Sequence, residues 1–346
     1  MDSRVDIILS ILVISHNQRH LLSRCLDSIL KQKLKVSYEI IVSDDRSSDG
    51  TWELIEEYTR KFPDIIRGVK CNSDECNPVN NSERCGWNKA NAYKHAKGKF
   101  FVNIDADDYL KSDDIYQKQI DMLMANPDCS MCQQRVWQVN EGSPMESGNA
   151  WPSHPKLKEG VKLNAKEIMQ NDLQGMNQTY MIRQNPDDNP AKKLGKWFND
   201  TYITLYYLQF GKVIFIDRSD YVWVQYDSSI SHSFDGDDRL VLYALLPSRH
   251  ALMIPSLKEL LVTRPNLPMV HLLKKSMLHK VSMQPNTIRF LAQFNGFIFD
   301  YYTGEQRGII KRIRLFQILL LYKQIKFGKK TGEEPKKKLY NLLLGK

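Results

Sequence analysis

Three carboxylates directly follow an apolar stretch near the middle of the first half of the chain. Residues 100–104 predict a buried strand, and Asp105, Asp107 and Asp108 come at its carboxyl end. Open α/β sheets bind their ligands in the crevice at the carboxyl ends of their strands. Two carboxylates separated by the small Ala106 can bind Mg²⁺ or Mn²⁺, which would bridge phosphate oxygens. The alternative interpretation is a strand-to-helix turn in which Asp108 caps the next segment.

A second acidic segment follows an earlier predicted strand. Residues 38–43 predict this strand, and the turn from Asp44 to Thr51 comes directly after it. A carboxylate at the end of a second parallel strand can accept hydrogen bonds from a ribose or a base N–H, so Asp44 is a candidate nucleoside ligand. As a turn alone the segment would also be unremarkable, because each of its residues favours turns or helix caps.

The elements that must position these side chains alternate between strand and helix. Alternating elements with right-handed crossovers predict an α/β fold with a mostly parallel central sheet flanked by helices. The predicted strands are residues 7–15, 38–43, 65–70, 100–104, 129–139, 212–217 and 221–226. The predicted helices are residues 18–32, 52–62, 86–97, 113–125, 164–171 and 201–210. Residues 140–163 are rich in Gly, Pro and Ser and predict a mobile loop over the site.

Length and charge predict three regions in the 346 residues. We expect a catalytic domain at residues 1–230, a helical region at 231–306 and a basic tail at 307–346. The tail contains twelve Lys or Arg and two Glu, a net charge of +10, which leaves −1 of the total +9 for residues 1–306. A nearly neutral body argues against nucleic-acid binding. The apolar residues 7–14 are too few for a membrane span, which predicts a cytoplasmic protein.

The basic tail also has an apolar stripe. On a helix of residues 308–327, five large apolar side chains fall on one face with basic residues at its edges. A basic amphipathic helix of this kind lies in an anionic membrane interface, so we expect a peripheral protein at the inner face of the membrane. The alternative is that the stripe packs on the catalytic domain or on a second subunit, which would give a homodimer.

Several short motifs occur in a fixed order over residues 5–230. They are Ser15-His16-Asn17, the D-D-x-S-x-D-G-T turn at 44–51, a helix with Lys89, D-A-D-D at 105–108 and Asn199-Asp200 before a helix. In this order the motifs strongly resemble those of the family 2 inverting glycosyltransferases, which have the GT-A fold. The resemblance implies that the chain transfers a sugar from a nucleotide sugar and uses a divalent cation.

The resemblance also implies roles for particular residues. Asp44 occupies the position that binds the base or ribose, and Ser15 and Asn17 belong to a loop that lines the nucleotide. Asp105 contacts the ribose or the metal, and Asp107 binds the metal that carries the donor diphosphate. The remaining nucleotide-binding residue is Lys89, which stands where the family usually has Arg.

The same resemblance places the catalytic base at Asp200, with Asn199 where the family usually has Glu. A carboxylate at this position can take the proton of the attacking hydroxyl, while Trp197 packs on the acceptor ring and Asn199 is a second acceptor-binding candidate. The alternative interpretation of Asp200 is an N-cap of the helix at residues 201–210. His232 lies where related enzymes return a loop to the diphosphate, so it is a candidate metal ligand; the alternative is a solvated loop histidine.

The predicted function is therefore inverting transfer of a sugar from a UDP-sugar to a glycan or lipid-linked glycan in surface polysaccharide biosynthesis. One alternative is a nucleotidyltransferase that makes sugar nucleotides. Such an enzyme is expected to have a glycine-rich phosphate loop after the first strand, and residues 15–19 contain no glycine. The other alternative is a non-catalytic glycan-binding protein, against which the joint presence of Asp44, Asp105, Asp107 and Asp200 argues.

Overall fold

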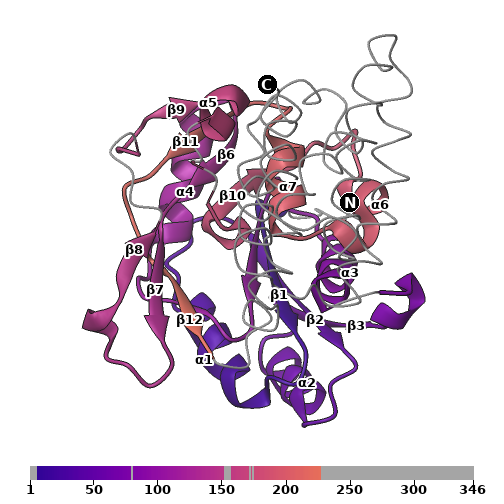
Figure 1. Cartoon of the computed structure of the whole chain (residues 1–346). Helices are drawn as coiled ribbons and strands as arrows, with labels where there is room; N and C mark the ends of the chain where they lie inside the picture. Colours follow the sequence, from indigo (N-terminus) through magenta and orange to yellow (C-terminus); the bar gives the residue numbers. More distant parts are fainter. Residues whose placement is uncertain (1–5, 79–80, 152–156, 171–172, 174, 227–346) are drawn as a thin grey trace, which may run out of the picture. The chain divides into compact units, whose positions relative to one another are not determined.

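The computed structural model describes residues 6–78, 81–151, 157–170, 173 and 175–226. The expected helical region at 231–306 and the expected basic tail at 307–346 lie outside the described residues. The described part is an α/β structure built on two sheets (Figure 1), which confirms the predicted fold class. No helix in the described ranges is both long enough and apolar enough to cross a membrane.

The larger sheet has eight strands in the order β3-β2-β1-β4-β10-β6-β11-β9. Its strands are β1 (Leu9–Ser15), β2 (Tyr38–Asp45), β3 (Ile66–Cys71), β4 (Phe100–Asp105), β6 (Cys129–Gln133), β9 (Lys162–Leu163), β10 (Tyr180–Arg183) and β11 (Lys212–Phe215). The first four strands of the order run parallel to one another. The next strand, β10, is antiparallel to both β4 and β6, and β9 forms an antiparallel edge.

Helices cover both faces of the larger sheet. The α-helices are α1 (Arg19–Leu30), α2 (Thr51–Lys61), α3 (Asn81–Tyr93), α4 (Ile115–Ala125), α5 (Ala165–Gln170), α6 (Pro190–Leu194) and α7 (Asp200–Tyr207). Short 3-10 helices are η1 (Ser73–Cys76), η2 (Met145–Ser147), η3 (Asn177–Thr179) and η4 (Gly195–Trp197). Apolar side chains of α1, α2 and α4 share a core with β1, β2 and β4 on one face. On the other face, Phe101 of β4 packs against Tyr93 of α3 and Tyr207 of α7.

This layering follows from the alternation of side chains along each strand. All seven residues of β1 are buried, as expected for a strand covered by helices on both faces. Leu9, Ile11 and Val13 belong to the core beneath α1. Along β4, Phe101 and Asp105 lie on the same side because they are four residues apart, so Asp105 faces the layer of α3 and α7.

A smaller sheet of four strands, in the order β5-β12-β7-β8, adjoins the D-A-D-D segment (Figure 1). Its strands are β5 (Tyr109–Leu110), β7 (Val136–Asn140), β8 (Asn149–Trp151) and β12 (Tyr221–Gln225). The predicted single strand 129–139 is wrong, because it divides into β6 in the larger sheet and β7 in the smaller one. Between them, the amide N–H of Gln134 donates to Thr179 and that of Arg135 to Arg218, so the backbone changes partners at this point.

Two other sequence predictions need correction. The helix expected at 86–97 begins five residues earlier and ends at Tyr93, and α3 therefore presents its first turns to η4. The expected loop at 140–163 contains η2, β8 and β9, and β8 pairs with β7. Two short paired strands and one turn of 3-10 helix thus interrupt the segment that was predicted to be irregular.

Gly86 lets α3 approach η4 closely, and its replacement tests this packing. A Cβ at position 86 would clash with the backbone carbonyl oxygen of Lys196. In an unobstructed helix, Gly→Ala stabilises by up to about 1 kcal/mol. We expect Gly86→Ala to lower the free energy of unfolding instead, by about 1–3 kcal/mol, because the two backbones must separate. Urea denaturation measures this, and unchanged or increased stability would show that the approach is not tight.

Candidate functional site

The register of three parallel strands brings two acidic segments to the same edge of the sheet. Ser15, the last residue of β1, lies beside Asp44 of β2, and Ile14 lies beside Asp105 of β4. Because neighbouring strands are about 4.8 Å apart, the backbones of Asp44 and Asp105 lie about 10 Å apart across β1. The edge predicted from the sequence is therefore present, and it contains carboxylates from the ends of β2 and β4.

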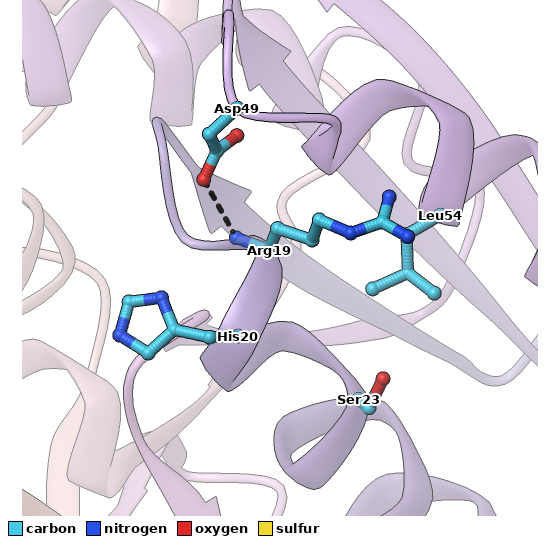
Figure 2. Close-up of a pocket in the computed structure, with 5 residues that line it drawn as sticks. All are labelled: Arg19, His20, Ser23, Asp49 and Leu54. Atoms are coloured by element: carbon cyan, nitrogen blue, oxygen red, sulfur yellow. Dashed lines mark hydrogen bonds between the residues drawn. The ribbon is translucent and has the colours of Figure 1, made fainter.

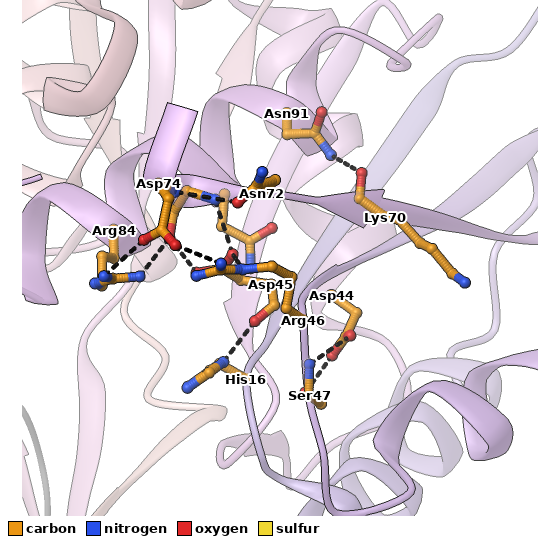
Figure 3. A network of polar contacts seen from close by, with 12 residues as sticks. His16, Asp44, Asp45, Arg46, Ser47, Lys70, Asn72, Asp74, Arg84 and Asn91 are labelled. Carbon is orange, nitrogen blue, oxygen red and sulfur yellow. Dashed lines mark hydrogen bonds and ion pairs between the residues drawn. The ribbon is translucent and has the colours of Figure 1, made fainter. Parts of the chain in front are cut away.

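The carboxylate of Asp44 is buried and held by hydroxyl and amide groups (Figure 3). Ser15 Oγ donates to Asp44 Oδ1 at 3.0 Å, Ser47 Oγ donates to the same oxygen at 2.5 Å, and Ser47 N donates to Oδ2 at 3.1 Å. Asp44 is 2% exposed. These contacts agree with the turn interpretation of the segment, and they also bring together two predicted nucleotide-binding residues, Ser15 and Asp44.

Asn17 joins the turns that follow β1 and β2. Its backbone has a φ of 53°, a left-handed conformation that Asn tolerates better than most residues. Its amide N–H donates to Ser47 Oγ at 2.7 Å, and its Oδ1 accepts from the amide N–H of Ser48 at 2.8 Å. The predicted nucleotide-binding residues Ser15, Asn17 and Asp44 therefore belong to one hydrogen-bonded cluster.

Hydrogen bonds and ion pairs hold the loop after β3 at the carboxyl edge of the sheet (Figure 3). Asp45 accepts from Ser73 N at 2.9 Å and from Ser73 Oγ at 2.5 Å. Asp74 of the same loop pairs with Arg46 at 2.5 Å and with Arg84 of α3 at 2.8 Å. The chain after β3 is thus tied both to the turn after β2 and to the start of α3.

Lys89 of α3 is buried and lies beside the first carboxylate of the D-A-D-D segment. Its Nζ is 3.3 Å from Asp105 Oδ1, and the residue is 1% exposed. A lysine is almost never buried to this extent without a charged partner. The neighbouring Asn88 spans the ends of two strands, because its Nδ2 donates to Ser15 O at 3.1 Å and to Ser43 O at 3.2 Å. The second half of α3 therefore positions Lys89 against Asp105.

Asp107 is the carboxylate of this segment with the fewest polar partners in the described contacts. Burial, and then the nearby Asp105 carboxylate, raise the pKa of Asp107 to about 6, although a hydrogen bond from Gln18 opposes the rise. A divalent cation bound here would remove this electrostatic cost. Within the described ranges, no group of three or more His, Cys, Asp or Glu residues lies close enough together to hold a metal ion.

Asp108 supports the smaller sheet and does not cap the following helix. Its carboxylate accepts hydrogen bonds from the Tyr221 hydroxyl and from Val224 N at 3.0 Å, and both partners belong to β12. Burial, and then the neighbouring Asp107 and Asp105, raise the pKa of Asp108 well above its usual value. The N-cap of α4 is Asp114. The capping interpretation of Asp108 is therefore wrong, and the residue links the D-A-D-D turn to β12.

The predicted acceptor residues lie against the first turns of α3. Trp197 Nε1 donates to Glu83 Oε1 at 3.4 Å, and Asn199 Nδ2 donates to Ser82 Oγ at 3.3 Å. Asn199 is also the N-cap of α7, so the capping interpretation of Asp200 is wrong. Asp200 is the first residue of α7, and its side chain lies outside the described part of the structure, as does the whole of His232.

Two residues that contact the D-A-D-D segment were missed from the sequence. Gln178 of η3 donates from Nε2 to Asp105 Oδ2 at 2.6 Å. Arg24 of α1 donates to the Asp107 carbonyl at 2.7 Å and to the Tyr226 hydroxyl at 2.9 Å. Neither belongs to a recognisable motif, so the sequence contained no signal that could have identified them.

A separate open hollow lies between the first turns of α1 and α2 (Figure 2). It has a volume of about 460 Å³ and is lined by Arg19, His20, Ser23, Asp49 and Leu54. Arg19 N donates to Asp49 Oδ2 at 3.0 Å, and this bond ties the two helix starts together. The hollow contains none of the predicted site residues.

Comparison with known proteins agrees with this geometry. The family model described as Glycosyl transferase family 2 matches residues 10–176. The crystal structure of S. aureus TarS 1–349 in complex with UDP-GlcNAc has a TM-score of 0.52 at 18% identity, over 71% of this chain and 67% of that chain. Residues 10–176 therefore match glycosyltransferase family 2, and the sheet and flanking helices of the described part have the GT-A fold.

Two curated relatives have named activities. A poly(ribitol-phosphate) beta-glucosyltransferase of Bacillus spizizenii is 33% identical over 109 residues, which are 30% of this chain and 16% of that protein. The UDP-Glc:alpha-D-GlcNAc-diphosphoundecaprenol beta-1,3-glucosyltransferase WfaP of Escherichia coli is 30% identical over 102 residues, 30% of this chain and 36% of that protein. The match thus spans only about a sixth to a third of the length of these relatives.

The raised pKa of Asp107 gives a pH-dependent prediction for the metal-free protein. A carboxyl with a folded-state pKa of about 6 stabilises the fold at low pH, and this contribution is lost as pH rises through that value. In a chelating buffer, we expect Asp107→Asn to melt at a higher temperature than the wild type at about pH 7.5 and at the same temperature near about pH 4. The exposed Asp121→Asn should match the wild type at both. Equal melting of Asp107→Asn and the wild type at the higher pH would contradict the assignment.

Proposed function

We propose that the chain is an inverting glycosyltransferase that moves a sugar from a nucleotide sugar, UDP-linked, to a hydroxyl of a glycan or lipid-linked glycan. The observation that carries the proposal is the alignment of Asp44 and Asp105 on either side of β1, at the carboxyl edge of the sheet. Ligands of open α/β sheets bind at this edge. The cluster of Ser15, Asn17 and Asp44 is the proposed nucleoside side of the site, and Lys89 and Asp105 form its floor.

The second carboxylate of the D-A-D-D segment is the proposed metal ligand. Asp105 is close to the Lys89 ammonium, a competing cation, whereas Asp107 is half-buried with a raised pKa. Asp107 therefore fits Mn²⁺ or Mg²⁺ better than Asp105 does, and His232 is a proposed further ligand. When bound, such an ion acts as a Lewis acid that neutralises the negative charge developing on the departing diphosphate.

Asp200 is the proposed general base. The attacking hydroxyl must lose a proton as the new glycosidic bond forms, and a carboxylate within hydrogen-bond reach accelerates this step by about 10²–10⁴. Asp200 begins α7, and Trp197 and Asn199 lie within the three residues before it, so we assign all three to one acceptor sugar. Inversion follows from a single displacement, in which the hydroxyl attacks the face of the sugar opposite the diphosphate.

The relatives support the donor and the pathway class. WfaP uses UDP-Glc and a diphosphoundecaprenol-linked sugar, and the Bacillus relative glucosylates poly(ribitol-phosphate). One acceptor is therefore a polymer of ribitol phosphate and the other is a sugar on diphosphoundecaprenol. We therefore extend to this chain a role in the biosynthesis of a surface polysaccharide or glycolipid.

The base is tested by replacing it with an isosteric amide. We expect Asp200→Asn to lower the transfer rate by at least about 10²-fold while UDP affinity stays near that of the wild type, because the base acts on the acceptor and not on the nucleotide. The matched control Asp121→Asn should retain full turnover. Transfer by Asp200→Asn at the wild-type rate would contradict the assignment of Asp200 as general base. Loss of UDP binding by this variant would indicate that Asp200 acts on the nucleotide instead.

We also propose that residues 307–346 bind an anionic membrane surface close to a lipid-linked acceptor. Each Lys or Arg near such a surface contributes about 1 kcal/mol of attraction. Deletion of residues 307–346 should abolish co-sedimentation of the protein with phosphatidylglycerol vesicles, and vesicles of phosphatidylcholine alone should bind neither form. Equal binding of both forms to the anionic vesicles would refute this part of the proposal.

A further inference from the structure

Gln178 is a buried polar residue that no sequence motif identified and that the proposed chemistry above does not use. It lies in η3, directly before β10, and is 4% exposed. Its Nε2 donates to Asp105 Oδ2 at 2.6 Å, while the other oxygen of that carboxylate lies 3.3 Å from Lys89 Nζ. Asp105 is therefore held from two sides, by an ammonium on α3 and by an amide on η3.

The backbone of η3 is fixed independently of this contact. Thr179 O accepts from Gln134 N at 3.1 Å and from Gln119 Nε2 at 3.2 Å, and Thr179 Oγ1 donates to Met176 O at 2.6 Å. Strand β10, which follows, pairs with both β4 and β6. Gln178 thus projects from an anchored turn, and its loss would leave the anchoring bonds in place.

The amide of Gln178 is poorly used for stability. Its Oε1 is buried and finds no hydrogen-bond partner within the described residues. A buried carbonyl without a partner costs about 1–3 kcal/mol, which an apolar side chain of the same shape would avoid. A polar residue kept in such a place despite this cost is characteristic of functional sites, where activity and stability conflict.

We propose that Gln178 is a positioning residue for donor binding, which acts by fixing the orientation of the Asp105 carboxylate. The inference rests on the proposed function, because it assigns Asp105 to the donor nucleotide. Gln178 Nε2 binds one oxygen of the Asp105 carboxylate and the Lys89 ammonium lies beside the other. These two contacts prevent the carboxylate from rotating. The nucleotide then binds to an Asp105 carboxylate that is already oriented, so no free energy of binding is spent on ordering this side chain.

The test compares two buried glutamines on neighbouring elements. Gln178→Met keeps the side-chain shape and removes the donor to Asp105. Gln119 does not contact Asp105 in the described contacts, and its replacement by Met removes donors to the carbonyl oxygens of Cys132 and Thr179. The bonds that hold η3 through Gln134 N and Thr179 Oγ1 remain in this variant. Calorimetric binding of UDP in the presence of Mn²⁺ and the melting temperature of the full-length protein are measured for both variants.

We expect the two variants to show opposite patterns. Gln178→Met should weaken UDP binding about tenfold, because the hydrogen bond that orients the charged Asp105 carboxylate is lost. The melting temperature should not fall, because the cost of the unpaired Gln178 Oε1 is removed at the same time. Gln119→Met should lower the melting temperature and bind UDP as the wild type does. A third variant, Gln178→Glu, places a second carboxylate against Asp105 and should weaken UDP binding more than Gln178→Met.

The outcomes separate this inference from the function on which it rests. Unchanged UDP affinity in Gln178→Met would overturn the positioning role and leave the proposed function intact. A fall in melting temperature as large as that of Gln119→Met would also overturn it, because the amide would then be structural. Absence of UDP binding by the wild-type protein would overturn both.

Discussion

The site depends on how the fold compensates three carboxylates at the end of one buried strand. Asp105 is held by the Lys89 ammonium and the Gln178 amide, and Asp108 by the Tyr221 hydroxyl and the Val224 amide. These partners come from α3, η3 and β12, so the elements on both sides of β4 are organised by its charged end. Asp107 and Asp108 both have raised pKa values, but Asp108 is buried, so the charge of Asp107 is the one that a cation can reach.

The compensation requires particular connections in the fold. The parallel order β2-β1-β4 places the turns after β1 and β2 beside the D-A-D-D segment. The antiparallel β10 brings η3 up to the same edge, and the smaller sheet meets that edge through Asp108. Asp44 and Asp105 lie on the two strands that flank β1, and this pairing fixes the spacing of about 10 Å between their backbones.

Much of this could be predicted from the sequence, because it depends on local patterns. Apolar runs that end in Asp identified β2 and β4, and the order of short motifs identified the family. The division of residues 129–139 between two sheets could not be predicted, since it depends on backbone bonds to Thr179 and Arg218, which are distant in sequence. Gln178 was missed for the same reason: a lone glutamine has no meaning until β10 is placed beside β4.

The central claim is that Asp107 binds the cation that holds a nucleoside diphosphate at this edge. Calorimetric titration of UDP into wild-type protein and Asp107→Asn, each with Mn²⁺ and with a chelator, tests it most directly. The account predicts that Mn²⁺ strengthens UDP binding to the wild type at least about tenfold and has no such effect on Asp107→Asn. An equal Mn²⁺ effect on both proteins, or none on the wild type, would contradict the account.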